Sequence, residues 1–91
     1  MKDVFIYDAI RSPRARAKAN GGLHGLTPPA LLKPLYRALE ARNQLDPKTI
    51  SEVVLGCVTQ HGEQAANIAK TSALYAGWPD SVAGLTVHRF C

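Results

Sequence analysis

The sequence predicts an α/β domain with a mostly parallel β-sheet. Three short apolar runs, at residues 4–11, 51–58 and 82–90, have the β-branched and aromatic content of strands, and two stretches with helical spacing separate them. This alternating order implies two right-handed crossovers, because parallel neighbours need a long connection. With 91 residues and 46% hydrophobic content, the chain can form one hydrophobic core at most.

The first predicted strand, VFIYDAIR at residues 4–11, is apolar at nearly every position, with Asp8 as the only charge before Arg11. This pattern is typical of a strand that is covered on both faces. Residues 11–25 then turn to Arg, Lys, Ala, Asn and Gly and end in NGGLHG, which indicates a loop. The loop carries a basic cluster of four cations, Arg11, Arg14, Arg16 and Lys18.

The first predicted helix begins at Thr27, an N-cap residue followed by Pro28 in the first turn. Leucines then recur at the spacing of one helical face, and the helix is expected to end before Asp46 and Pro47. Pro34 conflicts with a regular helix, because an interior proline removes a backbone donor at a cost of about 3 kcal/mol. We therefore expect the helix to kink at Pro34 or to begin there.

The second predicted strand is SEVVLGCV at residues 51–58, and an alanine-rich helix follows within residues 65–79. This helix is expected to end with Gly77 at C′, with Pro79 beyond it. The third strand is VAGLTVHRF at residues 82–90. Because ligands gather beyond the carboxyl ends of parallel strands, the loop at 11–25, the loop TQHGEQ at 59–64 and Cys91 are expected to converge on one rim.

Several kinds of site are not expected. The formal charge of +4 selects no partner by itself, and nucleic acid is not expected because no aromatic residue is interleaved with the cations of the basic cluster. No apolar run approaches the roughly 20 residues of a membrane span and no secretory signal opens the chain, so a soluble, cytoplasmic protein is expected. His24 and His61 lack metal-ligand spacing, GGLHG lacks the nucleotide-binding pattern G-x-G-x-x-G, and no disulfide is expected between Cys57 and Cys91.

Three segments taken in order resemble the start of the thiolase family of acyl-CoA acyltransferases, which includes acetyl-CoA C-acetyltransferases and 3-ketoacyl-CoA thiolases. IRSPRARAKANGGL resembles the opening R-T-P loop, GCVTQHGEQAANIAKTSALYAGWP resembles the stretch from G-x-V to A-G-x-P, and LTVHRFC resembles the run into the nucleophilic cysteine. The resemblance implies that residues 1–91 are the N-terminal part of a thiolase N-terminal domain, truncated before the remainder of the enzyme.

By the same resemblance, Cys91 is the catalytic cysteine that takes up the acyl group in a ping-pong mechanism. The implied reaction moves an acyl group between CoA thioesters, by thiolysis of a 3-oxoacyl-CoA or by Claisen condensation of acetyl-CoA. CoA or acyl-CoA would be the substrate, with no permanently bound cofactor and no metal, and the full-length protein would be a homodimer or homotetramer. The other catalytic groups belong to later segments of the family, so the 91-residue chain alone is expected to be inactive.

The resemblance assigns no CoA-binding residue in this chain. For the basic cluster, a phosphate contact and a solvated loop or subunit contact both remain open, and Ala15 stands where the family typically has glycine. Cys57 matches a position of varied residues and is expected to be a small packed hydrophobe, not the family's second cysteine.

Glu63, Gln64 and Asn67 precede the second helix and are expected to cap it, although the resemblance also suggests a place near a dimer interface. His88 stands where the family usually carries asparagine. Residues three apart on a strand point to opposite faces, so we expect His88 to be a hydrogen-bonding residue beside the site or at an interface, and not the base that activates Cys91.

Two other functions stay open. A ketoacyl synthase or hydroxymethylglutaryl-CoA synthase of the same superfamily would use a similar cysteine with different later partners. A non-catalytic fragment that acts as an assembly module would fold without turnover.

Overall fold

The computed structural model describes residues 2–90. It contains helix α1 (Pro28–Asn43), strand β1 (Glu52–Gly56), helix α2 (Ile68–Tyr75) and strand β2 (Ala83–Val87), with short 3-10 helices η1 (Pro47–Thr49) and η2 (Gly62–Gln64). The two strands form a parallel sheet in which Glu52 pairs with Ala83 and Gly56 pairs with Val87. The predicted α/β class and the parallel pairing of these strands are confirmed.

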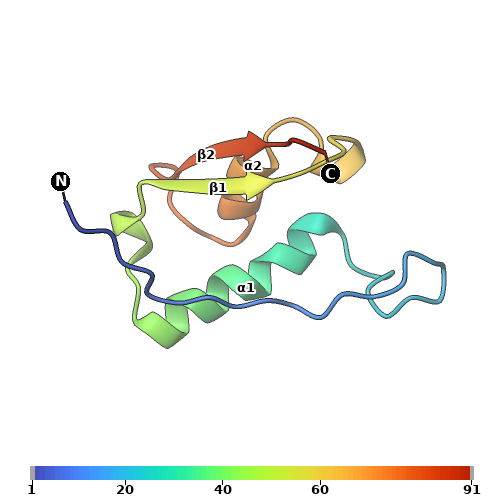
Figure 1. Cartoon of the computed structure of the whole chain (residues 1–91), viewed down its shortest axis with the longest axis horizontal. Coiled ribbons are helices and arrows are strands. Elements are labelled where there is room, and N and C mark those ends of the chain that lie inside the picture. Colours follow the sequence, from blue (N-terminus) through green and yellow to red (C-terminus); the bar gives the residue numbers. More distant parts are fainter. Residues whose placement is uncertain (1, 91) are drawn as a thin grey trace.

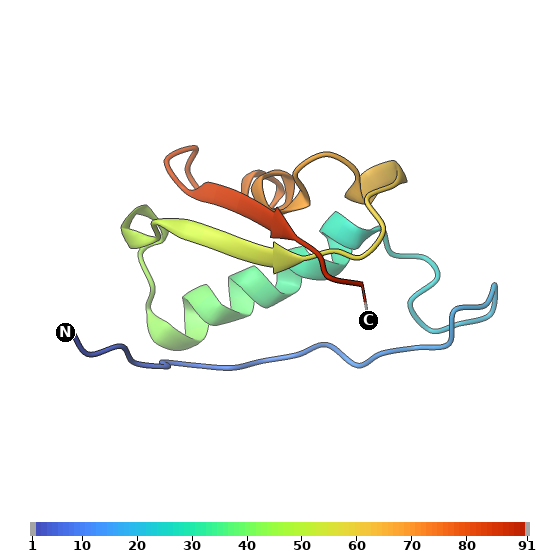
Figure 2. The same ribbon diagram turned by 45° about the horizontal axis from the view of Figure 1, so that its top comes forward.

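Both helices cover the same face of the sheet (Figure 2). On β1, Val53 and Leu55 are partly buried while Val54 between them is 61% exposed, so one face is covered and the other is open. The core lies between α1, α2 and the chain that leads into β2, and its buried members are Tyr36, Ala73, Ala76, Trp78 and Val82. The rings of Tyr36 and Trp78 stack at a centroid distance of 4.8 Å.

Helix α1 begins and ends where the sequence predicts. The Thr27 hydroxyl accepts a hydrogen bond from the backbone N–H of Ala30, and Pro28 occupies the first turn. The helix ends at Asn43, and Gln44 follows in the left-handed region with φ of 49°. The predicted alternative of a start at Pro34 is wrong, because the helix starts at Pro28 and runs through Pro34.

Helix α2 is shorter than the predicted stretch at residues 65–79. Ala66 has φ of 56°, outside helical geometry, and Asn67 caps the helix, so regular structure starts only at Ile68. The predicted C-terminus is confirmed: Gly77 has φ of 85°, and the N–H of Trp78 bonds back to the carbonyl of Ala73 at 3.0 Å. Glycine suits this position because a side chain is strained at positive φ.

The prediction of a strand at residues 4–11 is wrong for this structure. The segment is extended but pairs with no strand within residues 2–90, and it runs alongside α1 instead (Figure 1). Its apolar side chains, expected to be covered on both faces, are largely exposed, from 69% for Phe5 to 92% for Val4. Apolar content predicts an extended segment, but a strand also needs a partner edge, and the described sheet has only two strands.

Candidate functional site

The predicted rim lies at one end of the molecule. Residues 11–26, the η2 loop and residues 88–90 all lie at the end toward which both strand arrows point, in both views (Figures 1 and 2). This is the carboxyl end of a parallel sheet, where loops that follow different strands approach one another. The two predicted loops therefore lie at the same end as residues 88–90, whereas Cys91, the third predicted member of this rim, lies outside the described residues.

The predicted nucleophile, Cys91, lies outside the described residues. The chain before it leaves β2 at Val87 and continues through His88 and Arg89 to Phe90, which has φ of 53°. A positive φ is uncommon for a residue with a bulky side chain. His88 is exposed, and its ring meets the Phe90 ring edge-on, with centroids 5.3 Å apart.

Cys57 lies at the carboxyl end of β1, where its backbone N–H donates to the carbonyl of Val87 at 2.9 Å. Its thiol is free and partly buried, and it donates to the carbonyl oxygens of Thr59 at 3.5 Å and Gln64 at 3.8 Å. It lines a hollow of about 350 Å³ together with apolar residues of α1 and β1. These contacts fit the predicted role of a small packed side chain.

Asn67 is the N-cap of α2, as the sequence predicts, because its Oδ1 accepts from the backbone N–H of Lys70 at 3.3 Å. The same side chain also reaches β2: Nδ2 donates to the carbonyl of Gly84 at 2.8 Å, and Oδ1 accepts from Thr86 Oγ1 at 2.7 Å. Thr86 Oγ1 in turn accepts from the N–H of Ala69 at 3.2 Å. One amide therefore fixes the start of the helix against the strand that leads toward Cys91.

Glu63 and Gln64 do not cap α2. They lie in η2, and the Gln64 side chain donates to the carbonyl of Thr59, which closes the loop after β1. The sequence did not predict that Thr86 and Lys70 help to join α2 to β2. Lys70 Nζ donates to the carbonyls of Asp80 at 2.6 Å and Val82 at 2.7 Å, and nothing in a single sequence indicates which distant carbonyls a lysine will reach.

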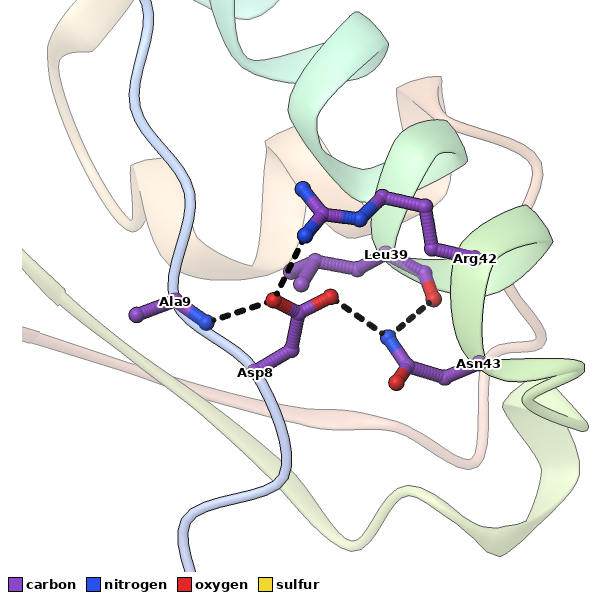
Figure 3. A network of polar contacts seen from close by, with 5 residues as sticks. All are labelled: Asp8, Ala9, Leu39, Arg42 and Asn43. Atoms are coloured by element: carbon purple, nitrogen blue, oxygen red, sulfur yellow. Dashed lines mark hydrogen bonds and ion pairs between the residues drawn. The ribbon is translucent and has the colours of Figure 1, made fainter.

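The N-terminal segment is tied to α1 through Asp8 (Figure 3). Its carboxylate accepts from Asn43 Nδ2 at 2.9 Å, from the backbone N–H of Ala9 at 2.8 Å and from Arg42 at 3.1 Å. The hydrogen bond from Asn43, followed by that from Ala9 and the charge of Arg42, lowers the pKa of Asp8 below its ordinary value. The contact holds the segment on the C-terminal half of the helix.

The described residues contain neither a metal-binding cluster nor a membrane-spanning helix. Within residues 2–90, no group of three or more His, Cys, Asp or Glu side chains is placed to hold a metal ion, and His24 and His61 are both exposed. Over the same residues, no helix has the length and apolar character needed to cross a membrane.

Comparison with known proteins gives one consistent result. Residues 4–91 match the family described as thiolase, N-terminal domain. The chain is 46% identical over its whole length to a 3-ketoacyl-CoA thiolase of Shewanella loihica, covering 24% of that protein, and 42% identical over 99% of its length to one of Acinetobacter baumannii, covering 23%. The crystal structure of the Bacillus anthracis acetyl-CoA acetyltransferase matches 76% of the chain with a TM-score of 0.66 and 38% identity, covering 17% of that structure.

The chain thus spans about a quarter of the length of the curated relatives it matches. The match reaches from the first apolar segment to the last residue, so it includes the segments at residues 10–23, 56–79 and 85–91 that resemble the family. The chain belongs to the thiolase family.

Proposed function

We propose that residues 1–91 form the N-terminal part of a thiolase N-terminal domain in a longer enzyme that transfers acyl groups between CoA thioesters. The observation that carries the proposal is the family match over residues 4–91, which includes Cys91 at the end of LTVHRFC. The names of the similar proteins, 3-ketoacyl-CoA thiolase and acetyl-CoA acetyltransferase, support this class of reaction.

In the proposed reaction, the Cys91 thiolate attacks the substrate carbonyl and forms an acyl-enzyme. In thiolysis of a 3-oxoacyl-CoA, the bond between C2 and C3 breaks, acetyl-CoA leaves after its carbanion gains a proton, and the acyl group then passes to the thiol of a second CoA. Condensation of acetyl-CoA is the reverse. The covalent intermediate divides one difficult displacement into two easier ones.

The described residues support this proposal by the way they hold the chain before Cys91. Strand β2 pairs in parallel with β1, and the amide of Asn67 joins β2 to α2 through Gly84 and Thr86. Because β2 ends four residues before Cys91, these contacts direct the end of the chain to the carboxyl end of the sheet. That is the end at which parallel sheets bind ligands.

The 91-residue chain alone is proposed to be inactive. A cysteine attacks as thiolate, its free pKa is about 8.5, and an activating imidazole or helix N-terminus would have to lower it. By the family resemblance those groups belong to later segments.

The longer enzyme is proposed to use acyl-CoA as substrate, to need no permanently bound cofactor, and to assemble as a homodimer or homotetramer.

Turnover of the full-length protein tests the proposal. Thiolysis of a 3-oxoacyl-CoA is measured for the natural enzyme, for Cys91→Ser and for the matched control Cys57→Ser. We expect Cys91→Ser to lose on the order of 10³-fold or more in kcat, because a serine hydroxyl is a far weaker nucleophile without its own activating base. Cys57→Ser retains most of the activity. Equal activity of the two variants contradicts the assignment of Cys91.

A further inference from the structure

The chain contains three asparagines, at positions 20, 43 and 67, and their surroundings differ. All three residues are exposed, so access to water does not separate them. Asn43 Nδ2 donates to Asp8 and to a backbone carbonyl of α1, both at 2.9 Å, and Asn67 is held by its cap on α2 and its hydrogen bonds to β2. Within residues 2–90, the side chain of Asn20 makes no hydrogen bond. Its amide is therefore free to change conformation.

The residue that follows each asparagine separates them in the same way. Asn43 is followed by glutamine and Asn67 by a β-branched isoleucine. Asn20 is followed by Gly21. An asparagine loses its amide when the backbone nitrogen of the next residue attacks its side-chain carbonyl carbon, and a side chain on that next residue hinders the attack. Glycine has no side chain, so Asn20 is the asparagine most open to this reaction.

The fold requires a glycine at position 21. A Cβ there would overlap the carbonyl oxygen of Arg16, so any other residue would displace the backbone. The N–H of Gly21 donates to the carbonyl of Lys18 at 2.8 Å and closes a turn in which Asn20 is the third residue. The carbonyl of Gly21 in turn accepts from the N–H of His24 at 3.1 Å. The packing of the loop therefore keeps glycine next to Asn20.

We propose that Asn20 is a site of deamidation through a succinimide, and that this modification opens the turn between Lys18 and Gly21. The nitrogen of Gly21 forms a bond to Cγ of Asn20, the bond from Cγ to Nδ2 breaks, and ammonia leaves with the proton of the attacking nitrogen. Water then opens the ring and leaves aspartate or isoaspartate at position 20. Isoaspartate adds one carbon to the backbone, so the turn cannot close with its former geometry.

The hydrogen bond of Gly21 also governs how fast the folded chain reacts. Its nitrogen donates to the carbonyl of Lys18 and must leave that carbonyl before it can attack, so the reaction proceeds from a state in which the turn is open. The loop is exposed and lies outside the helices and strands, and segments of this kind open at a small part of the global free energy of unfolding. We therefore expect the folded chain to react, but more slowly than the unfolded chain.

The test is incubation of the folded, full-length protein at mildly alkaline pH, followed by digestion and mass spectrometry of the peptides that carry the three asparagines. The peptide of Asn20 should lose its amide at least about tenfold faster than those of Asn43 and Asn67, because hydrogen bonds that hold the latter two must break before they react. Labelling by a protein isoaspartate methyltransferase, which methylates isoaspartate and not an ordinary aspartate, should mark the same peptide.

Equal rates for the three peptides, or a faster reaction at Asn43 or Asn67, overturn the proposal. So does an Asn20 peptide that stays unmodified in the folded protein while it reacts in the unfolded chain. None of these outcomes depends on the reaction proposed for Cys91, so the inference and the proposed function stand or fall separately.

Two variants test the chemistry of the site. Asn20→Gln keeps the amide but lengthens the side chain by one carbon, which disfavours ring formation, so its peptide should keep its mass. Gly22→Ala is the matched control, because an ideal Cβ there meets only the Cβ of Ala15, at 4.0 Å, and its nitrogen is not the one that attacks. It should change the rate at Asn20 by about twofold at most. Loss of the amide from Asn20→Gln at the natural rate would overturn the succinimide route.

A third variant separates the added charge from the longer backbone. Asn20→Asp carries the new carboxylate on an unchanged backbone, so the amide of Gly21 should stay protected in hydrogen exchange. The isoaspartate form of the natural chain should lose that protection, because the turn to Lys18 is open. Equal protection of Gly21 in the two forms would show that the turn survives the modification, and would overturn the proposed opening.

Discussion

Thr86 Oγ1 donates a hydrogen bond of 2.7 Å to Oδ1 of Asn67, and so joins β2 to the N-terminus of α2. Asn67 Nδ2 also donates to the carbonyl of Gly84 in β2, and Asn67 Oδ1 accepts from the backbone N–H of Lys70 in α2. A helix cap is a local device, but here it also sets how the helix lies on the strand that leads toward Cys91.

Two substitutions of Asn67 should lower the free energy of unfolding by different amounts, because they remove different contacts. Asn67→Ala removes the cap and the contacts to β2, and we expect it to lower the free energy of unfolding by about 1–2 kcal/mol. Asn67→Asp keeps an oxygen for the cap but loses the donor to Gly84, so its cost should be smaller. Chemical denaturation measures both, with Asn20→Ala in the exposed loop as the control. If Asn20→Ala lowered the free energy of unfolding as much as Asn67→Ala does, the proposed role of the Asn67 contacts would be contradicted.

The close approach of β2 to α2 predicts a second effect. A Cβ on Gly84 would lie 2.4 Å from the backbone nitrogen of Lys70, so Gly84→Ala must push the strand and helix apart. We expect a loss of about 1–3 kcal/mol in the free energy of unfolding. Gly56, on the neighbouring strand, has nothing within 4 Å of its ideal Cβ position, so Gly56→Ala should change stability by about 0.5 kcal/mol at most. Equal effects of the two substitutions would be inconsistent with the packing described.

The buried hydrogen bond between Tyr36 and Ser72 should couple the two helices. The hydroxyl oxygens lie 2.9 Å apart in the core, and Ser72 Oγ also bonds to the carbonyl of Ala69. Tyr36→Phe should therefore cost about 1 kcal/mol, because Ser72 retains a partner. In a double-mutant cycle with Ser72→Ala, the double variant should cost less than the sum of the single variants. Strict additivity would show that the bond contributes nothing.

The contacts of Asp8 predict its titration. Its folded-state pKa lies below the ordinary value, so the stability that it adds is present above that ordinary value and is lost as the pH falls through the folded-state pKa. Carboxyl carbon shifts followed by NMR should show Asp8 titrating below pH 3.8, the ordinary pKa of an aspartate. Asn43→Ala should raise this pKa more than Arg42→Gln does, because the Asn43 hydrogen bond is the largest cause. A pKa at or above 3.8 in the unmodified chain would contradict the contacts.

Local signals in the sequence predicted local structure well. The Thr27 and Pro28 start of α1, the Gly77 end of α2 and the Asn67 cap each depend on backbone groups within a few residues, and all are confirmed. The segment at residues 4–11 shows where this reasoning stops. Its composition predicts a strand, but a strand exists only with a partner edge, and the segment lies along α1 instead.

In the candidate site, too, some features could be predicted from the sequence and others could not. The η2 loop and residues 88–90 lie at one end because the parallel strands β1 and β2 end there, as the order of elements predicts. Residues 11–26 lie at the same end but follow a segment that is not part of the sheet. The contacts of Lys70 with Asp80 and Val82, and the hydrogen bond from Thr86 to Asn67, join residues 10–19 positions apart. Pairings of this kind depend on how the elements pack, and residue type alone does not fix them.

Mass spectrometry of the full-length enzyme after incubation with acetyl-CoA tests the central claim most directly. We predict an acetyl adduct on the peptide that carries Cys91, none on the peptide that carries Cys57, and loss of the adduct when a second CoA accepts the acyl group. An enzyme that turns over while Cys91 stays unmodified under conditions that trap the intermediate would contradict the account.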